Sequence, residues 1–266
     1  MAEAAIRFDA ISKTFTRSDG STVEAVKSTT FAVEDGELVC IVGPSGCGKS
    51  TLLRLGAGLT APNSGRIAID GEAVSAPRRD VGIVFQSPIL LPWRTTMQNV
   101  MLPITIYRLP EAPARERAVQ LMDLVGLKGF ENSYPHELSG GMQQRAAIAR
   151  ALVHEPQIMM MDEPFGALDA MTRQLMNLEL TRIWDAQKKT VVLITHDIGE
   201  AIFLADRVLV MSARPGTILE TIRVDLPRPR HLSVLAESAF GRYVHTIQQL
   251  LGLDKLFESQ GARAQG

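Results

Sequence analysis

The sequence of 266 residues has very little cysteine, almost no net charge and no long apolar run. Two cysteines are too few for a disulfide framework, which favours a reducing cytoplasm. Cys40 is expected in the core, and a reactive thiol is one interpretation of Cys47. The 28 Lys and Arg against 29 Asp and Glu argue against a nucleic-acid-binding surface. No apolar stretch approaches the roughly 18 residues of a membrane helix, and residues 1–8 lack a secretion signal. We therefore expect a soluble chain, which would reach a membrane only by docking to another protein.

The hydrophobic pattern changes twice along the chain. The first part combines segments rich in Val, Ile and Phe with turn residues, which is typical of short strands. Helical spacing follows, and from Ile158 apolar strands alternate with helices again. Such alternation indicates a mostly parallel sheet covered on both faces. We expect an α/β core of residues 1–87 and 158–223, a helical segment at 88–157, and a C-terminal helical extension at 224–266.

A glycine-rich loop follows the apolar run 38–42 and precedes a helix-like segment. It satisfies the template G-x-x-x-x-G-K-[ST] with Gly43, Gly48, Lys49 and Ser50. In such a loop, backbone N–H groups wrap the phosphates, Lys49 neutralises the β and γ oxygens, and the Ser50 hydroxyl binds Mg²⁺. The candidate nucleotide-binding residues are Gly43, Pro44, Ser45, Gly46, Cys47, Gly48, Lys49, Ser50 and Thr51.

A second glycine-rich helix start lies at residues 138–144, with the sequence Leu-Ser-Gly-Gly-Met-Gln-Gln. Its unpaired N–H groups and positive dipole end suit an anion. Because one nucleotide needs only one such cradle, two helix starts of this kind predict a site shared between two copies. The candidate contacts are Ser139, Gly140, Gly141 and Gln143.

Two adjacent acids, Asp162 and Glu163, end the apolar run 158–161. An apolar strand places them at the carboxyl edge of the sheet, where open α/β sheets bind ligands. There Asp162 would hold Mg²⁺ through water, and Glu163 would orient or deprotonate the attacking water. An ordinary strand-end turn before Pro164 is the alternative.

Taken together, these motifs resemble those of the ATP-binding subunit of an ABC transporter, over about residues 6–224. The segment 138–144 is similar to the signature that separates this family from other P-loop ATPases. The resemblance implies an α/β P-loop NTPase core with a mixed, mostly parallel sheet, an N-terminal antiparallel β region and an inserted helical subdomain. It also implies a dimer, expected to be of identical copies, in which the signature of one copy contacts the γ-phosphate of ATP held with Mg²⁺ by the other.

The resemblance assigns four further residues. Gln86 matches the glutamine that senses Mg²⁺ and the water, although a polar strand end is the simpler interpretation. Asp169 matches an acid at the dimer interface and also suits a helix N-cap. His196 matches the histidine that contacts the γ-phosphate, although a structural role is common for a lone histidine. Phe15 falls where an aromatic ring stacks on adenine, and a core role remains open.

Three segments with less specific sequence similarity, residues 86–95, 212–216 and 225–230, resemble the nitrate, sulfonate and taurine import subfamily. Trp93 lies where the family docks a helix of the membrane subunit, although it could pack on the helical segment instead. The resemblance thus implies permease subunits as partners, a solute-binding protein acting indirectly, and a peripheral position on the cytoplasmic face of the inner membrane. A cytosolic assembly or genome-maintenance ATPase, and a module that binds ATP without turnover, are the alternatives.

Overall fold

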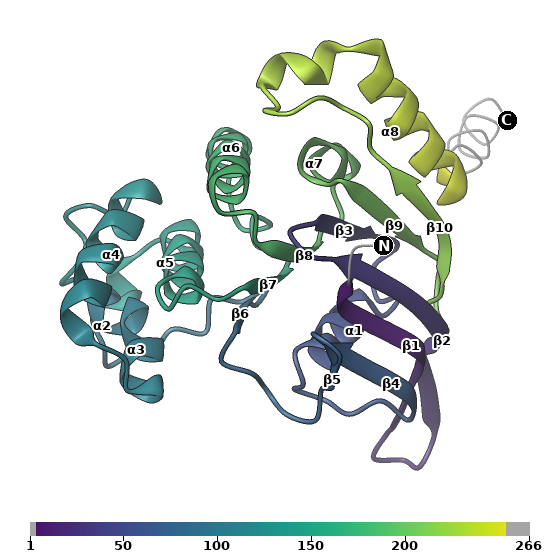
Figure 1. Cartoon of the computed structure of the whole chain (residues 1–266), viewed down its shortest axis with the longest axis horizontal. Coiled ribbons are helices and arrows are strands. Elements are labelled where there is room, and N and C mark those ends of the chain that lie inside the picture. The colour runs from purple at the N-terminus through teal and green to yellow at the C-terminus, as the bar shows by residue number, and fades with distance from the viewer. Residues whose placement is uncertain (1–3, 254–266) are drawn as a thin grey trace, which may run out of the picture.

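The computed structural model describes residues 4–253, except for the side chains of residues 183, 186 and 187. Two sheets organise the chain (Figure 1). A four-stranded sheet has the order β2-β1-β4-β5, and a six-stranded sheet has the order β10-β9-β3-β8-β7-β6. The strands are β1 (Ala4–Thr16), β2 (Thr22–Glu34), β3 (Leu38–Val42), β4 (Ser64–Ile69), β5 (Glu72–Ala73), β6 (Val81–Val84), β7 (Ile158–Asp162), β8 (Thr190–Ile194), β9 (Arg207–Met211) and β10 (Ile218–Arg223).

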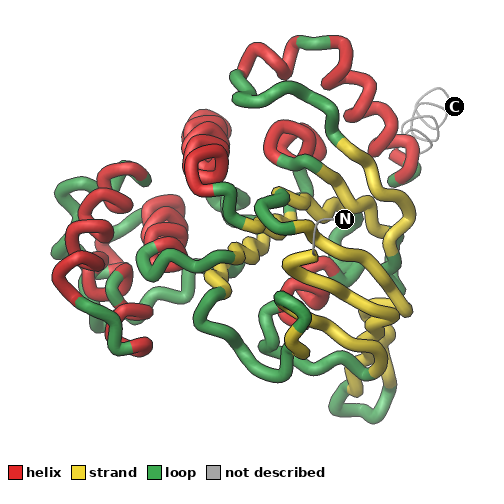
Figure 2. Tube along the Cα trace, in the orientation of Figure 1, coloured by secondary structure: helices red, strands yellow, loops and turns green. Residues whose placement is uncertain are grey.

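One group of helices lies together on one side of the molecule, and the other helices lie beside the strands (Figure 2). They are α1 (Lys49–Gly56), α2 (Thr96–Val100), α3 (Leu102–Tyr107), α4 (Glu111–Leu124), η1 (Pro135–Glu137), α5 (Gly140–Leu152), α6 (Ala170–Gln187), α7 (Ile198–Leu204), η2 (Leu232–Ala236) and α8 (Ser238–Leu250). The predicted helical segment is therefore α2 to α5. Residues 254–266 of the predicted C-terminal extension lie outside the described residues.

Strand β3 shows how the six-stranded sheet forms the core. All five of its side chains are buried, and they alternate between the two faces. Leu38 and Cys40 pack with the helices on one face, whereas Val39 and Ile41 pack with α1 and the four-stranded sheet on the other. A strand covered on both faces needs a continuous apolar run, which is what the sequence provides. The core position predicted for Cys40 is confirmed.

The N-terminal sheet is antiparallel, as predicted, and it covers α1. The prediction of short strands is wrong here, because β1 and β2 each have 13 residues. Their pairing shifts register between Phe8 and Ile11, and Ala10 between them has a φ of +47°. A bulge of this kind absorbs an irregular residue and lets the pairing continue.

The chain after β9 adds an element that the sequence analysis missed. Strand β10 pairs antiparallel with β9 at the edge of an otherwise parallel sheet. Beyond it, the Arg230 guanidinium donates to the carbonyl oxygens of Ile202, Phe203 and Ala205 at the end of α7. Burial and, to a lesser extent, the charge of Arg228 lower the pKa of Arg230 to about 10. These bonds hold the C-terminal extension against α7.

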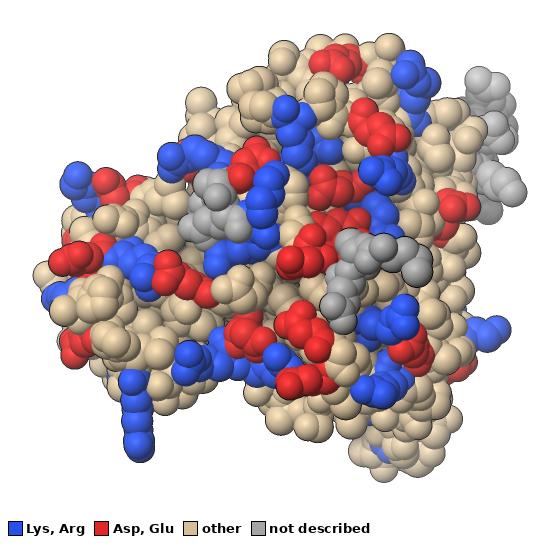
Figure 3. Space-filling view, in the orientation of Figure 1, with Lys and Arg blue, Asp and Glu red and all other residues tan. Residues whose placement is uncertain are grey.

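The surface drawn in Figure 3 carries Lys and Arg interspersed with Asp and Glu. A polyanion-binding face would gather basic side chains in one stripe. Across residues 4–253, no helix is both long enough and apolar enough to cross a bilayer.

Candidate functional site

The phosphate-binding loop joins the carboxyl end of β3 to the start of α1. Two of its glycines have positive φ angles, +70° at Gly46 and +109° at Gly48. A Cβ on Gly48 would stand 2.5 Å from the Ala25 carbonyl oxygen, so backbone angle and space both require glycine there. The main chain can therefore curl in front of α1, as the template predicts.

Lys49 lies inside this loop. It is 6% exposed, and its Nζ donates to the carbonyl oxygens of Gly43 at 2.8 Å and Pro44 at 3.0 Å. Within the described residues, the backbone N–H groups of Gly46, Gly48 and Lys49 have no hydrogen-bond acceptor. An ammonium and several free N–H groups at a helix start fit the phosphate chain of a nucleotide.

The segment after β9 braces the outer side of the loop. The Arg214 guanidinium donates to the Gly46 carbonyl oxygen from Nε at 3.0 Å and from Nη2 at 2.8 Å. Gly216 lies so close that a Cβ there would overlap the Cys47 carbonyl oxygen, and Cys47 itself is 1% exposed. The Cys47 side chain is therefore a packing group, which disfavours the reactive thiol. The sequence analysis missed this brace because Arg214 and Gly46 lie 168 residues apart.

Ser50 and Asp162 meet at the start of α1 and the end of β7. The Ser50 hydroxyl donates to Asp162 Oδ1 at 3.1 Å, and Asp162 is 6% exposed. Burial raises the pKa of Asp162, the Ser50 hydrogen bond lowers it, and the charge of Glu163 raises it again. A buried carboxylate beside a hydroxyl is a pair of hard oxygen ligands, which suits Mg²⁺. No group of three or more His, Cys, Asp or Glu in residues 4–253 offers a metal site. A site with few protein ligands suits Mg²⁺, which keeps waters and substrate phosphates in its shell.

Two of the predicted side chains contact the same carboxylate oxygen of Glu163. Gln86 Nε2 donates to Glu163 Oε2 at 3.2 Å, and His196 Nδ1 lies 3.1 Å from the same atom. The backbone N–H of Glu163 donates to the Ile194 carbonyl oxygen of β8 at 2.9 Å, which holds its φ at +45°. A non-glycine residue held in this region is unusual and is often found at functional sites. The acid, the amide and the imidazole thus converge at the carboxyl edge of the sheet.

The second glycine-rich helix start is built differently. Ser139 is the N-cap of α5, and its Oγ accepts a hydrogen bond from the Met142 N–H at 3.3 Å. Gly140 is exposed, with nothing within 4 Å of a Cβ placed on it. Gln143 Nε2 donates to the carbonyl oxygens of Pro135 and Leu138, at 2.9 and 3.2 Å. Gln143 therefore holds the chain that leads into Ser139.

The two helix starts are not brought together within one chain. α1 packs between the two sheets, whereas α5 belongs to the helical group on the other side of the six-stranded sheet (Figure 1). Gly141 contacts the Leu168 side chain rather than the phosphate-binding loop, with 3.1 Å from a Cβ placed on Gly141 to Leu168 Cδ2. The sequence-based expectation of two separate cradles in one chain agrees with this arrangement.

Two other candidates lie at exposed positions. Asp169 caps α6, its Oδ1 accepting from the Thr172 N–H at 3.0 Å, and hydrogen bonds from Thr172 lower the pKa of Asp169. The N-cap interpretation is confirmed, and the interface role stays a prediction. Phe15 is 43% exposed on β1, with the Lys13 ammonium 5.3 Å from its ring centroid. A core role for Phe15 is wrong, and its ring is accessible to a stacking partner.

Trp93 follows an apolar groove in the chain, since Leu91, two residues before it, lines that groove. Trp93 is 70% exposed, so most of its side chain is open to solvent. The groove has a volume of about 390 Å³ and is lined in part by Ile89, Leu91, Ile106 and Tyr107. An exposed apolar surface of this kind marks an interaction site.

Comparison with known proteins identifies the family. The sequence profile described as ABC transporter matches residues 26–166, which include the phosphate-binding loop, the signature and both acids. The chain belongs to the ABC transporter family. The predicted ATP-binding cassette and its ATPase class are thereby confirmed, and the genome-maintenance alternative is not favoured.

The relatives of this ABC family member include two import proteins. The aliphatic sulfonates import ATP-binding protein SsuB of Bacillus cereus is 44% identical over 225 residues, covering 85% of this chain and 88% of the relative. The nitrate import ATP-binding protein NrtD of Synechocystis sp. is 44% identical over 247 residues, covering 91% and 92%. The likeness to the nitrate and sulfonate import proteins is confirmed.

A solved structure supports the fold. The ATP-binding cassette MJ0796, in a dimeric post-hydrolysis state bound to ADP and Pi, has a TM-score of 0.76 to this chain. It is 33% identical, and the match covers 84% of this chain and all of the solved one. The prediction of an α/β P-loop NTPase core with a mixed sheet, an antiparallel β region and an inserted helical part is confirmed.

Proposed function

We propose that two copies of this chain form an ATPase in which each site combines the phosphate-binding loop of one copy with the signature helix start of the other. The supporting observation is that both cradles are well formed but lie apart in the single chain. A dimer with two-fold symmetry places each loop opposite the partner's helix start, because the same surfaces meet twice.

The loop residues hold the nucleotide. Lys49 exchanges its bonds to the loop carbonyls for bonds to the β and γ oxygens, and the free N–H groups of Gly46, Gly48 and Lys49 surround the phosphates. Ser50, Asp162 and Gln86 are the residues that would hold Mg²⁺. When bound, Mg²⁺ neutralises the charge that develops on the phosphate oxygens.

Glu163 prepares the attacking water. Its Oε2 accepts a hydrogen bond from Gln86 Nε2 and lies within hydrogen-bond distance of His196 Nδ1, whereas its Oε1 accepts no hydrogen bond from the described residues. The two neighbours fix the direction of the carboxylate, and the free oxygen can accept the proton of a water. His196, which is 59% exposed at its side chain, is the group placed to reach the γ-phosphate.

The partner copy completes the site. Ser139, Gly140 and Gly141 would face the γ-phosphate across the interface, with Gln143 supporting them and Asp169 lying along the contact. Phe15 would stack on adenine. In this scheme ATP contributes to association only in the closed dimer, so binding and hydrolysis change which state is populated.

The dimer would drive import through permease subunits that dock at the exposed Trp93 and at the apolar groove that Leu91 lines. The names of the sulfonate and nitrate relatives support a small anionic solute, delivered by a solute-binding protein, with the ATPase peripheral on the cytoplasmic face of the membrane. In this proposal, residues 1–87 and 158–223 carry the nucleotide, residues 88–157 carry the signature, and residues 224–266 form an extension.

Complementation between two inactive variants tests the shared site. Lys49→Ala removes the loop lysine, and Ser139→Arg places a bulky charge at the helix start; we expect each variant alone to lose roughly 10²–10³ in phosphate release. Random mixing makes about half of the dimers mixed, each with one intact site, so about a quarter of wild-type turnover should return.

The control mixture is Lys49→Ala with Glu163→Gln. Both changes fall on the same half of a site, so each mixed dimer has no intact site and turnover should stay low. Recovery in this control, or none in the first mixture, would contradict the shared site.

A further inference from the structure

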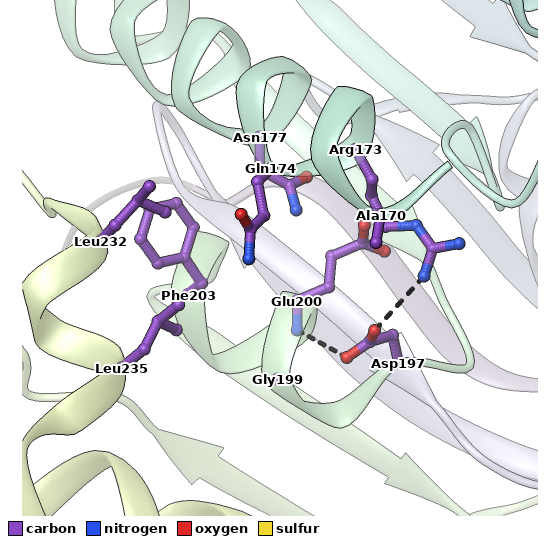
Figure 4. A pocket seen from close by; sticks show the side chains of 10 residues that line it. All are labelled: Ala170, Arg173, Gln174, Asn177, Asp197, Gly199, Glu200, Phe203, Leu232 and Leu235. Atoms are coloured by element: carbon purple, nitrogen blue, oxygen red, sulfur yellow. Dashed lines mark hydrogen bonds and ion pairs between the residues drawn. The ribbon is translucent and has the colours of Figure 1, made fainter. Parts of the chain in front are cut away.

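A cavity of about 200 Å³ lies between α6, α7 and η2, behind the predicted catalytic residues. Figure 4 shows polar side chains of α6 and α7 at one end and Phe203, Leu232 and Leu235 at the other. This volume equals that of about seven waters in the liquid. None of the proposed ATPase residues Lys49, Ser50, Asp162 or Glu163 lines it.

The polar end holds two buried acceptors without partners. Glu200 and Asn177 are each 7% exposed, and Glu200 Oε1 and Asn177 Oδ1 accept no hydrogen bond from the described residues. Burial raises the pKa of Glu200, and the neighbouring side chains of Thr195 and Asn177 lower it. Leaving such atoms unpaired costs about 1–3 kcal/mol each. They are therefore suited to a ligand that donates hydrogen bonds.

Arg173 narrows the choice of ligand. Its Nη1 lies 3.6 Å from Asp197 Oδ2, and its Nη2 donates to the Leu168 carbonyl oxygen at 3.2 Å. Only Nε is buried without a partner. Among the buried atoms without partners that line the cavity, two are acceptors and one is a donor, and the lining has two acids, Asp197 and Glu200, against the single cation Arg173, which disfavours an anion.

The apolar end is held in place by the C-terminal extension. Leu232 and Leu235 are 40% and 39% exposed and stand over Phe203, which is buried. The three bonds from Arg230 to the end of α7 fix the chain just before them. The cavity thus joins a fixed apolar wall to a pair of buried acceptors, a common design of small-molecule sites.

We propose that this cavity binds a small primary amine. The ammonium donates to Glu200 Oε1 and Asn177 Oδ1, and a short hydrocarbon chain lies against Phe203, Leu232 and Leu235. An ammonium supplies three donors and one positive charge, which matches two acceptors of which one is a carboxyl.

The position of the cavity links its ligand to ATP turnover. Arg173, Asp197 and Glu200 line it on one side and, on the other, line a small cavity that includes Glu163 and His196. Asp197 follows His196 directly and accepts a hydrogen bond from the Glu200 N–H at 3.0 Å. An amine bound to Glu200 therefore lies next to the N-cap of α7, Asp197, which is the residue that follows His196 in the chain.

Ligand-observed NMR on the full chain tests binding, with butylammonium chloride as the probe at constant ionic strength. We expect a dissociation constant in the millimolar range, on the order expected for about five heavy atoms. Butyrate, which has the same chain length and opposite charge, and ammonium, which lacks the chain, should bind at least about tenfold more weakly. Equal binding of all three, or a cavity that holds water only, overturns the proposal.

Variants locate the site. Asn177→Leu removes one acceptor and Glu200→Gln the charge, and each should weaken butylammonium binding about tenfold. Leu235→Ser, at the surface, should weaken it about two- to threefold without threatening the fold. The control is Leu219→Ser on β10, which is 47% exposed and distant, and it should leave the dissociation constant unchanged. Unchanged binding in the three cavity variants assigns the amine elsewhere and refutes the site.

Phosphate release measures the coupling separately. At butylammonium concentrations that saturate binding, we expect wild-type kcat to change at least about twofold, and the change to need about tenfold more amine in Asn177→Leu. Saturated binding with unaltered kcat overturns the coupling. Since binding is measured without ATP, the amine site can fail or succeed independently of the ATPase proposal.

Discussion

Replacing Arg214 by alanine should weaken ATP binding without slowing the chemical step. The guanidinium makes two hydrogen bonds to the Gly46 carbonyl oxygen, at 3.0 and 2.8 Å, and so holds that oxygen on the outer side of the loop. Hydrogen bonds to a charged group contribute about 1.5–3 kcal/mol, and exposure of Arg214 to solvent lowers this to about 1 kcal/mol. A loss of about 1 kcal/mol in loop organisation corresponds to about fivefold in affinity.

We expect a KM for ATP about fivefold higher with an unchanged kcat, because the loop binds the substrate and the transition state equally well. Steady-state phosphate release over a range of ATP concentrations measures both. Arg214→Lys keeps one donor and should lie between the wild type and alanine. The matched control is Arg223→Ala, since Arg223 is exposed and, among residues 4–253, forms an ion pair only with Asp225. A KM within twofold of wild type for Arg214→Ala, or a fall in kcat alone, refutes the bracing role.

Three further changes probe the site. Glu163→Gln should retain ATP binding and lose roughly 10²–10⁴ in turnover, and near-normal phosphate release would remove Glu163 from its role. Gly48→Ala should destabilise the protein by about 2–4 kcal/mol in urea, since its Cβ would stand 2.5 Å from the Ala25 carbonyl oxygen, whereas Gly20→Ala, with positive φ and no neighbour within 4 Å, should cost about 1 kcal/mol. The pKa of Asp162 is raised in the folded state, so its contribution to stability is present below the unfolded pKa near 3.8 and is lost as the pH rises through the folded pKa. Asp162→Asn should therefore raise the Tm at neutral pH in the absence of nucleotide. An equal or lower Tm would contradict the burial argument.

Local chemistry made much of the fold predictable. The apolar run of β3 followed by glycines predicts a strand, a turn and a helix, and Ser139, Asp169 and Asp197 each occupy the N-cap that their residue type favours. Each of these features depends on neighbours in sequence. The pairing of Asp162 with Ser50 was also within reach, because parallel strands end at one edge of the sheet.

Contacts between distant segments were not predictable. Arg214 reaches Gly46 only because β9 lies beside β3 in the sheet, and no local pattern near Arg214 records that neighbour. Strand β10 escaped because its pattern is only partly alternating, with Glu220 and Thr221 adjacent at its centre. The cavity behind Asp197 depends on the buried Arg230, whose guanidinium donates hydrogen bonds to three carbonyl oxygens at the end of α7. No local sequence pattern indicates that this charged residue is buried.

In the proposed mechanism, the position of Gln86 would make hydrolysis depend on the helical segment. Gln86 donates to Glu163 Oε2, and the residue before it, Phe85, accepts a hydrogen bond at its carbonyl oxygen from Gln144 Nε2 at 3.0 Å. Gln144 is fully buried on α5, the helix that begins at Ser139. A shift of α5 therefore pulls on the residue next to Gln86, and a bond of 3.2 Å to Glu163 has little length to spare. In the proposed dimer the same helix carries the signature, so a change in its contact with the partner's nucleotide would be accompanied by a change in the orientation of this chain's own Glu163.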